Sequence, residues 1–319
     1  MSYVVLIAGF VFLIKGADLL VEGASSLAKR LGVSDLVIGM TIVALGTSLP
    51  ELIVSVFAAA KGVTGIAIGN VIGSNIANIL LVLGVAAVIS PVIVARGTVR
   101  KEIPFCLLAA LQVALLPNDR IIEGETHNIL SRIDGFVLLS FLVLFLYYVF
   151  ELARSSEAEM LDVPEFTTTV PRSLGRIAIG LIGLTLGGQW VVRSATDIAR
   201  AFDVSDDIIG LTIVAIGTSL PELATSAVAA YRKNSDIAVG NIVGSNIFNV
   251  FLVLAVTAII HPLPFSSTNN IDVGVMIGTT MLLLLFMFTG RVKYEIQRIE
   301  GVIFLFSYAA YIGFLIYRS

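Results

Sequence analysis

The chain has 319 residues, of which 57% are hydrophobic and only 13% are charged, and its formal net charge is −3. Soluble domains carry about 25% charged residues, so the composition excludes a soluble globular domain and indicates a membrane protein with several spans. A single cysteine (Cys106) and two distant histidines (His127 and His261) exclude a disulfide framework and a zinc or copper cluster. The basic residues are dispersed and form no basic face for nucleic acid.

Runs of about 20 mostly apolar residues predict membrane-spanning helices. Because no strand-like alternation of a barrel is present, the chain is expected to be all-α. The apolar segment Met1–Leu13 lacks a basic start and a cleavage site, so it is interpreted as part of the first span. Ten spans are predicted, at 3–28, 36–60, 66–89, 102–117, 134–152, 174–200, 207–230, 237–260, 271–289 and 299–317.

The sequence repeats internally. Residues 37–91 align without gaps with 208–262 at an offset of 171 (222 − 51), and Val33-Ser34-Asp35 has a copy in Val204-Ser205-Asp206. Each copy has five spans, an odd number, so the second copy is expected to enter the membrane from the opposite side. Such inverted repeats are typical of secondary transporters with a site at the midplane. The predicted organisation is two five-helix halves, 1–153 and 174–319, joined by a linker at 154–173.

The loops predict the orientation of the chain. With the N-terminus outside, most lysines and arginines of the loops fall on the inside, so the positive-inside rule favours both termini outside. The acidic linker then lies in the cytoplasm. Its carboxylates, which include Glu157 and Glu165, lack the defined turn positions of a calcium loop, so a solvated connection is the favoured interpretation.

The most unusual stretch is Gly46-Thr47-Ser48-Leu49-Pro50-Glu51, which recurs as residues 217–222. Pro50 removes a backbone donor and clashes with the preceding turn, so the second and seventh helices are predicted to break. Carbonyl groups freed at such a break are tolerated in a membrane only inside protein or beside a wet cavity. A glutamate within a span is expected to be functional.

The third and eighth spans carry a second repeated group, Gly-Asn-x-x-Gly-Ser-Asn-Ile-x-Asn, at 69–78 and 240–249. Within each group a serine and an asparagine are four residues apart and share a helix face. Gly65, Gly69 and Gly73 also recur every four residues, a spacing that predicts close packing of the second and third spans.

The polar motifs of the second, third, seventh and eighth spans offer a cation only oxygen atoms, from carboxylates, hydroxyls, amides and backbone carbonyls. A single serine or asparagine in a span is more often a packing contact between helices, but the double occurrence of both groups favours an ion site. Oxygen ligands suit hard cations such as Ca²⁺, Mg²⁺ and Na⁺. The predicted ligands are Glu51, Glu222, Thr47, Thr218, Ser48, Ser219, Ser74, Ser245, Asn78 and Asn249, with freed carbonyls near Ala44 and Ala215.

Other polar residues lie within the first and sixth spans. They are Asp18, Glu22, Gln189, Arg193 and Asp197. Interpretations as snorkelling ends, as an internal pair or as the lining of an ion path remain open, and a structural or pathway role is favoured over direct ligation.

The two paired motifs resemble the signature repeats of the calcium/cation antiporter superfamily, and most of all its prokaryotic sodium/calcium exchanger branch. The resemblance implies that Glu51, Glu222, Thr47 and Thr218 bind calcium. It also implies flanking sodium sites at Ser48, Ser74, Ser219 and Ser245 with the carbonyls of Ala44 and Ala215. Spans two, three, seven and eight would form the core, and spans one and six would slide across it.

The resemblance has one departure. Similar exchangers often have an aspartate at one of the positions of Asn78 and Asn249, so two carboxylates rather than three are expected here. Thr-Ser before both glutamates resembles the sodium-coupled branch. The expected function is exchange of Na⁺ for Ca²⁺ in a prokaryotic plasma membrane, with these ions and the lipid bilayer as the only partners and with no cofactor.

Three alternatives stay open. A proton/Ca²⁺ antiporter could use the same carboxylates as proton carriers. A cation channel would need a ring of carboxylates around an open pore, whereas broken helices that meet at the midplane favour a closed site. An intramembrane enzyme would need a nucleophile with its base or an aspartate pair, and no predicted span offers either.

Overall fold

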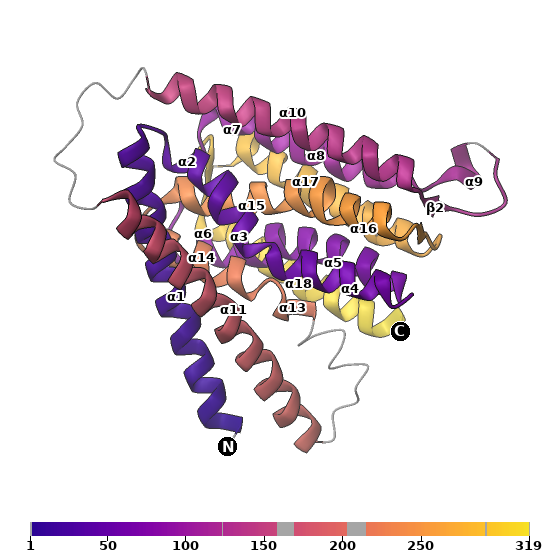
Figure 1. Ribbon diagram of the computed structural model, residues 1–319, viewed down its shortest axis with the longest axis horizontal. Coiled ribbons are helices and arrows are strands. Elements are labelled where there is room, and N and C mark those ends of the chain that lie inside the picture. The colour runs from indigo at the N-terminus through magenta and orange to yellow at the C-terminus, as the bar shows by residue number, and fades with distance from the viewer. Residues whose placement is uncertain (1, 123, 158–168, 203–214, 291, 319) are drawn as a thin grey trace.

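The computed structural model describes residues 2–122, 124–157, 169–202, 215–290 and 292–318, which are almost entirely helical (Figure 1). In the first half the elements are α1 (Ser2–Leu31), α2 (Asp35–Ile38), η1 (Gly39–Val43), α3 (Ala44–Thr47), α4 (Leu49–Ala60), α5 (Thr64–Ala77), η2 (Asn78–Leu83), α6 (Gly84–Ile89), β1 (Val92–Ile93), α7 (Arg96–Arg100), α8 (Glu102–Leu115), α9 (Asp119–Ile122), β2 (Ile129–Leu130) and α10 (Arg132–Glu157). In the second half they are α11 (Val170–Ala201), α13 (Ala215–Gly217), α14 (Leu220–Tyr231), α15 (Ser235–Phe248), η4 (Asn249–Leu254), α16 (Ala255–Ile260), β3 (Leu263–Pro264), α17 (Asn269–Thr289), β4 (Glu295–Ile296) and α18 (Arg298–Arg318). The three η elements are π-helical turns that continue the adjoining α-helices.

Eight of the predicted spans correspond to helices of the structure. Within the described residues, seven helices are long and apolar enough to cross a membrane, and residues 35–60 form one further span with a bend of 40°. The predicted fourth span differs, because α8 has only 14 residues, fewer than the roughly 20 that a straight crossing needs. In the predicted seventh span, residues 207–214 lie outside the described part of the chain, as does the Val204-Ser205-Asp206 copy, and the remainder forms α13 and α14.

Two very short antiparallel sheets, which the sequence did not predict, connect loops of the two halves. Val92 of β1 pairs with Ile296 of β4, and Ile129 of β2 pairs with Pro264 of β3. Two-residue strands leave no alternating pattern in a sequence. They tie loops together and leave the fold helical.

The two longest helices, α1 and α11, lie side by side and project from the rest of the molecule in Figure 1. Their contact is lined by small residues at intervals of seven: Gly9, Gly16 and Gly23 on α1 face Gly187, Gly180 and Ser173 on α11. A Cβ atom built on Gly16 would lie 2.8 Å from the carbonyl oxygen of Gly180. The backbones therefore touch directly, as small residues permit in membrane helices.

The best-buried helices are the two copies of the third predicted span, α5–η2–α6 and α15–η4–α16. Helices α4 and α14 pack on α5 and α15, respectively, while α10, α17 and α18 pack on α16, α8 and α6. The polar motifs of the sequence thus lie in the central layer, with apolar helices around them.

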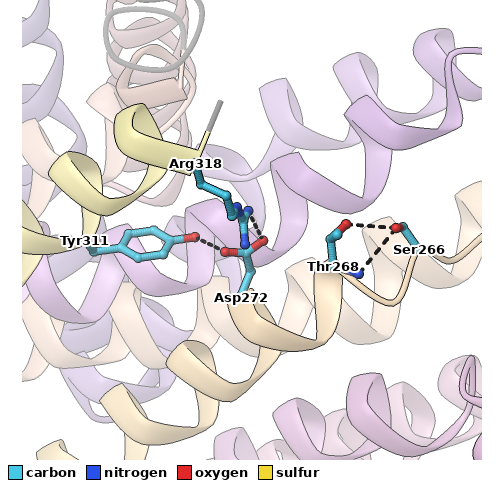
Figure 2. Close-up of polar contacts among 5 residues, drawn as sticks. All are labelled: Ser266, Thr268, Asp272, Tyr311 and Arg318. Carbon is cyan, nitrogen blue, oxygen red and sulfur yellow. Dashed lines mark hydrogen bonds and ion pairs between the residues drawn. The ribbon is translucent and has the colours of Figure 1, made fainter.

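The last two helices are tied together at one end (Figure 2). The Tyr311 hydroxyl of α18 donates to Asp272 of α17 at 3.1 Å, and Arg318 forms an ion pair of 2.7 Å with the same carboxylate. In the turn that precedes α17, the hydroxyls of Ser266 and Thr268 are 2.8 Å apart. These contacts fix the end of α18 beside the start of α17.

The predicted packing of the second and third spans is confirmed, but the described residues show no close contact at Gly65, Gly69 and Gly73. Helices α4 and α5 do pack together, but no described atom lies within 4 Å of a Cβ built on any of these glycines. The copies of the last two behave differently, because a Cβ on Gly240 would lie 2.9 Å from the carbonyl of Leu36 and one on Gly244 would lie 2.7 Å from that of Met40. Glycines four residues apart identify a helix face without side chains, but they do not identify the helix that packs against this face.

Candidate functional site

Both predicted helix breaks are present. Helix α3 ends at Thr47, and α4 begins at Leu49 with Pro50 in its first turn. In the second half α13 ends at Gly217 and α14 begins at Leu220 with Pro221. The residue before each new helix has the same conformation, φ −85° and ψ 2° at Ser48 and φ −85° and ψ 4° at Ser219. Proline has no backbone N–H to donate to the preceding helix. At both breaks the chain therefore starts a new helix within the same span.

The two glutamates lie in the first turns of these new helices and are buried, with 0% of Glu51 and 1% of Glu222 exposed. Each carboxylate has one oxygen in contact with a serine hydroxyl. Ser74 Oγ lies 3.5 Å from Glu51 Oε1, and Ser48 Oγ donates to Glu222 Oε1 at 3.3 Å. The second oxygen of each carboxylate, Oε2, has no hydrogen-bond partner among the described residues.

The threonines of the breaks contact asparagines of the opposite half. Thr47 Oγ1 donates to Asn241 Oδ1 at 3.0 Å, with the Ala44 carbonyl at 3.3 Å and Ser245 Oγ at 3.4 Å as more distant neighbours. Thr218 Oγ1 donates to Asn70 Oδ1 at 3.3 Å. A hydroxyl has one hydrogen and two lone pairs, so donation to the asparagine leaves the threonine oxygen available to a cation.

The same asparagines also hold the broken helices. Asn70 Nδ2 donates to the carbonyl of Glu51 at 3.3 Å and to Ser55 Oγ at 3.0 Å. In the second half Asn241 Nδ2 donates to the carbonyl of Glu222 at 3.4 Å and to Ser226 Oγ at 3.0 Å. Each glutamate is therefore fixed through its own backbone to the helix that follows it.

Asn78 and Asn249 lie where α5 and α15 pass into π-helical turns, and both are buried. Asn78 Nδ2 donates to Asn246 Oδ1 at 3.0 Å, and Asn249 Nδ2 donates to Asn75 Oδ1 at 3.1 Å. Their own amide oxygens receive no hydrogen bond from the described residues.

Among the predicted ligands, four buried carboxylate and amide oxygens therefore lack a donor from the described residues: Oε2 of Glu51 and Glu222, and Oδ1 of Asn78 and Asn249. A buried polar atom without a partner costs about 1–3 kcal/mol, and more when it is charged. Four such acceptors, two from each half, match the needs of a hard cation that takes only oxygen ligands. Within the described residues, no three His, Cys, Asp or Glu side chains are grouped so that they could hold a metal ion, so the donor set differs from that of a transition-metal centre.

The other predicted ligands lie around these oxygens. Ser245 Oγ is 3.4 Å from the Ala44 carbonyl, and both neighbour Thr47. Ser219 lies buried in the second break with its hydroxyl unpartnered among the described residues. Ala215 is the first residue of α13.

A cavity of about 440 Å³ reaches the site from the side of α11. Its lining includes Thr218 and Pro221, Gln189 and Arg193 of α11, and Leu49 and Val54 of α4. Gln189 and Arg193 thus line a cavity beside Thr218, and their place on an ion path stays a prediction. Asp197 is exposed on the same helix.

The acidic residues of α1 lie in ion pairs. Asp18 pairs with Arg232, which follows α14, and Glu22 pairs with Arg176 of α11 at 2.8 Å. The first pair joins α1 to the central layer, whereas the second joins the two long helices to each other. Both contacts agree with the interpretation of these residues as internal pairs.

Sequence reasoning missed Asn70, Asn75, Asn241 and Asn246, each of which bonds to a predicted ligand or to its backbone. The pattern that could have revealed them was present, because both asparagines of the Gly-Asn and Ser-Asn pairs occur in each copy. The sequence also did not reveal that Thr47, Ser48 and Asn78 all bond to the opposite half.

Comparison with known proteins gives a consistent result. The model of the family described as "Sodium/calcium exchanger protein" matches residues 1–151 and 172–317. The putative antiporter CaxA of Alkalimonas amylolytica is 38% identical over 302 residues, which cover 92% of each chain. The sodium/calcium exchanger MaX1 of Methanosarcina acetivorans is 32% identical over 99% of both chains. A solved structure of the sodium-calcium exchanger NCX_Mj, soaked with 10 mM Na⁺ and no Ca²⁺, superposes with a TM-score of 0.83 at 37% identity over 98% of both chains.

Proposed function

Because the chain belongs to the sodium/calcium exchanger family, we propose that this multi-pass membrane protein is a secondary antiporter that exchanges Na⁺ for Ca²⁺. The observation that carries the proposal is the set of four unpartnered buried oxygens, two of them on carboxylates. The names of its relatives MaX1 and NCX_Mj support the choice of ions.

In this proposal the calcium ion lies between Glu51 and Glu222, with Thr47 and Thr218 as neutral ligands. Sodium ions use the flanking oxygens of Ser48, Ser74, Ser219, Ser245, Asn78 and Asn249 and the carbonyls of Ala44 and Ala215. Two carboxylates are neutralised by one divalent ion or by two monovalent ions. An empty site with two buried charges is costly to expose to the other side of the membrane. The site therefore changes sides only with ions bound, and this couples the movement of Na⁺ to that of Ca²⁺.

We further propose that the protein works by alternating access between two inverted halves of five spans, with α1 and α11 as the moving pair. The cavity beside α11 supports one access route to the site, and the Asp18–Arg232 contact supports a closed route at the far end of α14. The halves are residues 1–153 and 174–319, with 154–173 as a cytoplasmic linker and both termini outside a prokaryotic plasma membrane.

The decisive experiment is a flux assay on the purified protein in lipid vesicles. Vesicles loaded with Na⁺ and diluted into K⁺ buffer should take up radioactive calcium, whereas K⁺-loaded vesicles should not. Glu51→Gln and Glu222→Gln should each reduce this uptake by at least about 100-fold, because each removes a charge that opposes the cation. Glu102→Gln is the matched control, since Glu102 is equally buried and also has one bonded and one unpartnered carboxylate oxygen, but its partner is Tyr148, outside the site.

Uptake that ignores the sodium gradient would contradict the proposal. Uptake driven by a pH gradient in sodium-free buffer would identify a proton/Ca²⁺ antiporter instead. Single-channel currents in a planar bilayer would indicate a channel.

A further inference from the structure

We propose that Asn75 and Asn246 are positioning residues that orient the amides of Asn78 and Asn249 so that oxygen, and not nitrogen, faces the transported cation. The inference rests on the proposed function, because it assigns a role toward the same site. Neither Asn75 nor Asn246 is itself in the predicted ligand set.

The two asparagines form a reciprocal contact between the halves. Asn75 Nδ2 donates to the backbone carbonyl of Asn246 at 3.3 Å, and Asn246 Nδ2 donates to the backbone carbonyl of Asn75 at 3.3 Å. Both side chains are buried, with 3% of Asn75 and 1% of Asn246 exposed. Helices α5 and α15 are therefore joined at this point by two antiparallel hydrogen bonds.

A backbone carbonyl only accepts hydrogen bonds, so it determines which end of the amide faces it. The nitrogen of Asn246 must point to the carbonyl of Asn75, and its oxygen must point away. That oxygen accepts from Asn78 Nδ2 at 3.0 Å. The nitrogen of Asn78 is thereby engaged, and its oxygen faces the opposite direction as one of the four unpartnered acceptors.

The same sequence of contacts runs in the other half. Asn75 Oδ1 accepts from Asn249 Nδ2 at 3.1 Å, which leaves Asn249 Oδ1 as an unpartnered acceptor. The backbone carbonyl of Asn75 thus orients Asn246, which orients Asn78. The backbone carbonyl of Asn246 likewise orients Asn75, which orients Asn249.

This control matters because the two ends of an amide have opposite effects on a cation. The carbonyl oxygen is a ligand for Ca²⁺ or Na⁺, whereas the amide nitrogen carries two donor hydrogens and no ligand lone pair. Without a neighbour that distinguishes the ends, the amide can turn over, and its hydrogens would then face the ion. Outer residues that orient ligands typically change metal affinity by about 10–100-fold when they are removed.

The test measures Ca²⁺ binding to detergent-purified protein by calorimetry, which does not require transport. Asn246→Leu is expected to weaken Ca²⁺ binding by about 10–100-fold. In the Asn78→Asp background the same substitution should not weaken binding, because a carboxylate presents oxygen at both ends and has no hydrogen to donate to Asn246 Oδ1. A residue that only holds the helices together would have the same effect in both backgrounds.

Asn270→Leu is the control, because Asn270 also belongs to an asparagine pair, with Asn118, which is partly buried and lies at the start of α17, outside the site. It should leave Ca²⁺ binding within about 2-fold of wild type, since metal affinity responds to orienting groups at the ligands themselves. If Asn246→Leu does not fold, Asn75→Leu with and without Asn249→Asp repeats the test in the other half.

The outcomes separate the two proposals. Binding that Asn246→Leu leaves unchanged, or equal losses in both backgrounds, would overturn the positioning role and leave the exchanger intact. A wild-type protein that binds neither Ca²⁺ nor Na⁺ would overturn both.

Discussion

At the scale of single residues, the candidate site depends on where hydrogens point. Thr47 and Thr218 donate to asparagines of the opposite half, and the nitrogens of Asn78 and Asn249 donate to the outer asparagines. With these hydrogens engaged, the remaining lone pairs are free to bind a cation at the proposed site. Neutral residues thus contribute to an electrostatic site without adding charge.

Thr47→Val should weaken Ca²⁺ binding and leave the fold intact. Valine has a similar shape but lacks the hydroxyl oxygen that is proposed to bind Ca²⁺. A polar contact to a charged group contributes about 1.5–3 kcal/mol, which corresponds to about 10–100-fold in affinity. The measurement is the Ca²⁺ concentration that half-saturates uptake. Thr41→Val is the control, since the Thr41 hydroxyl donates at 2.6 Å to the Val37 carbonyl of its own helix. Equal effects of the two variants would exclude a specific role for Thr47.

At the scale of the elements, the contact of α1 with α11 depends on the absence of side chains. Their backbones meet at Gly9, Gly16 and Gly23 without intervening atoms. A pair so closely matched is expected to move as one body, whereas the partly polar contact of α1 with the central layer can be rearranged.

Gly16→Ala should destabilise the protein, because the new Cβ would lie 2.8 Å from the Gly180 carbonyl. Overpacking of this kind costs about 1–3 kcal/mol. Gly175→Ala is the control on α11, where the structure describes no atom within 4 Å of the new methyl group. That substitution should be neutral or stabilise the helix by about 0.5–1 kcal/mol. Thermal unfolding in detergent distinguishes the two, and a Gly16→Ala midpoint at or above wild type would contradict the close contact.

The two ion pairs of α1 should have different effects on access to the site. Asp18→Asn breaks a contact between α1 and the end of α14, whereas Glu22→Gln breaks one within the α1–α11 pair. Only the first should shift the protein toward a state in which the cavity beside α11 is closed. A cysteine in place of Val54, which lines that cavity, should then react several-fold more slowly with a polar thiol reagent, since labelling reports the open population. The native Cys106 is buried.

The reversed pair Asp18→Arg with Arg232→Asp should restore the labelling rate. If Glu22→Gln slows labelling as much as Asp18→Asn does, then the Asp18 contact has no special part in access.

At the scale of the whole molecule, the site joins the two halves, so cations should stabilise the folded protein. Ca²⁺ at about 100 times its dissociation constant should add about 2.7 kcal/mol, and removal of Ca²⁺ and Na⁺ with a chelator and a choline buffer should reverse this. Glu222→Gln should reduce the stabilisation by Ca²⁺ and raise the unfolding temperature of the ion-free protein, because a buried unpaired charge is lost. A Ca²⁺ effect that Glu222→Gln leaves unchanged would place the bound ion elsewhere.

Much of this arrangement could be predicted from the sequence. Hydropathy located most spans, Pro50 and Pro221 located the breaks, and the repeat identified both glutamates. The neighbours of each helix could not be predicted, because periodicity describes one face of one helix. For this reason Gly65 was taken for a close contact and the true contact at Gly16 was not recognised. The π-helical turns at Asn78 and Asn249 also have no distinctive residue pattern.

The contact between Asn75 and Asn246 has an evolutionary consequence. These residues hold the same place in the two copies, since 246 − 75 = 171, and a bond between a residue and its own copy is one that two identical chains could form across a twofold axis. The contact is thus compatible with an ancestor of half the length that assembled as a homodimer. In such a dimer, a change of Asn78 to aspartate would alter the charge of the site by two units. A fused chain can change one copy alone and thereby adjust the charge by a single unit.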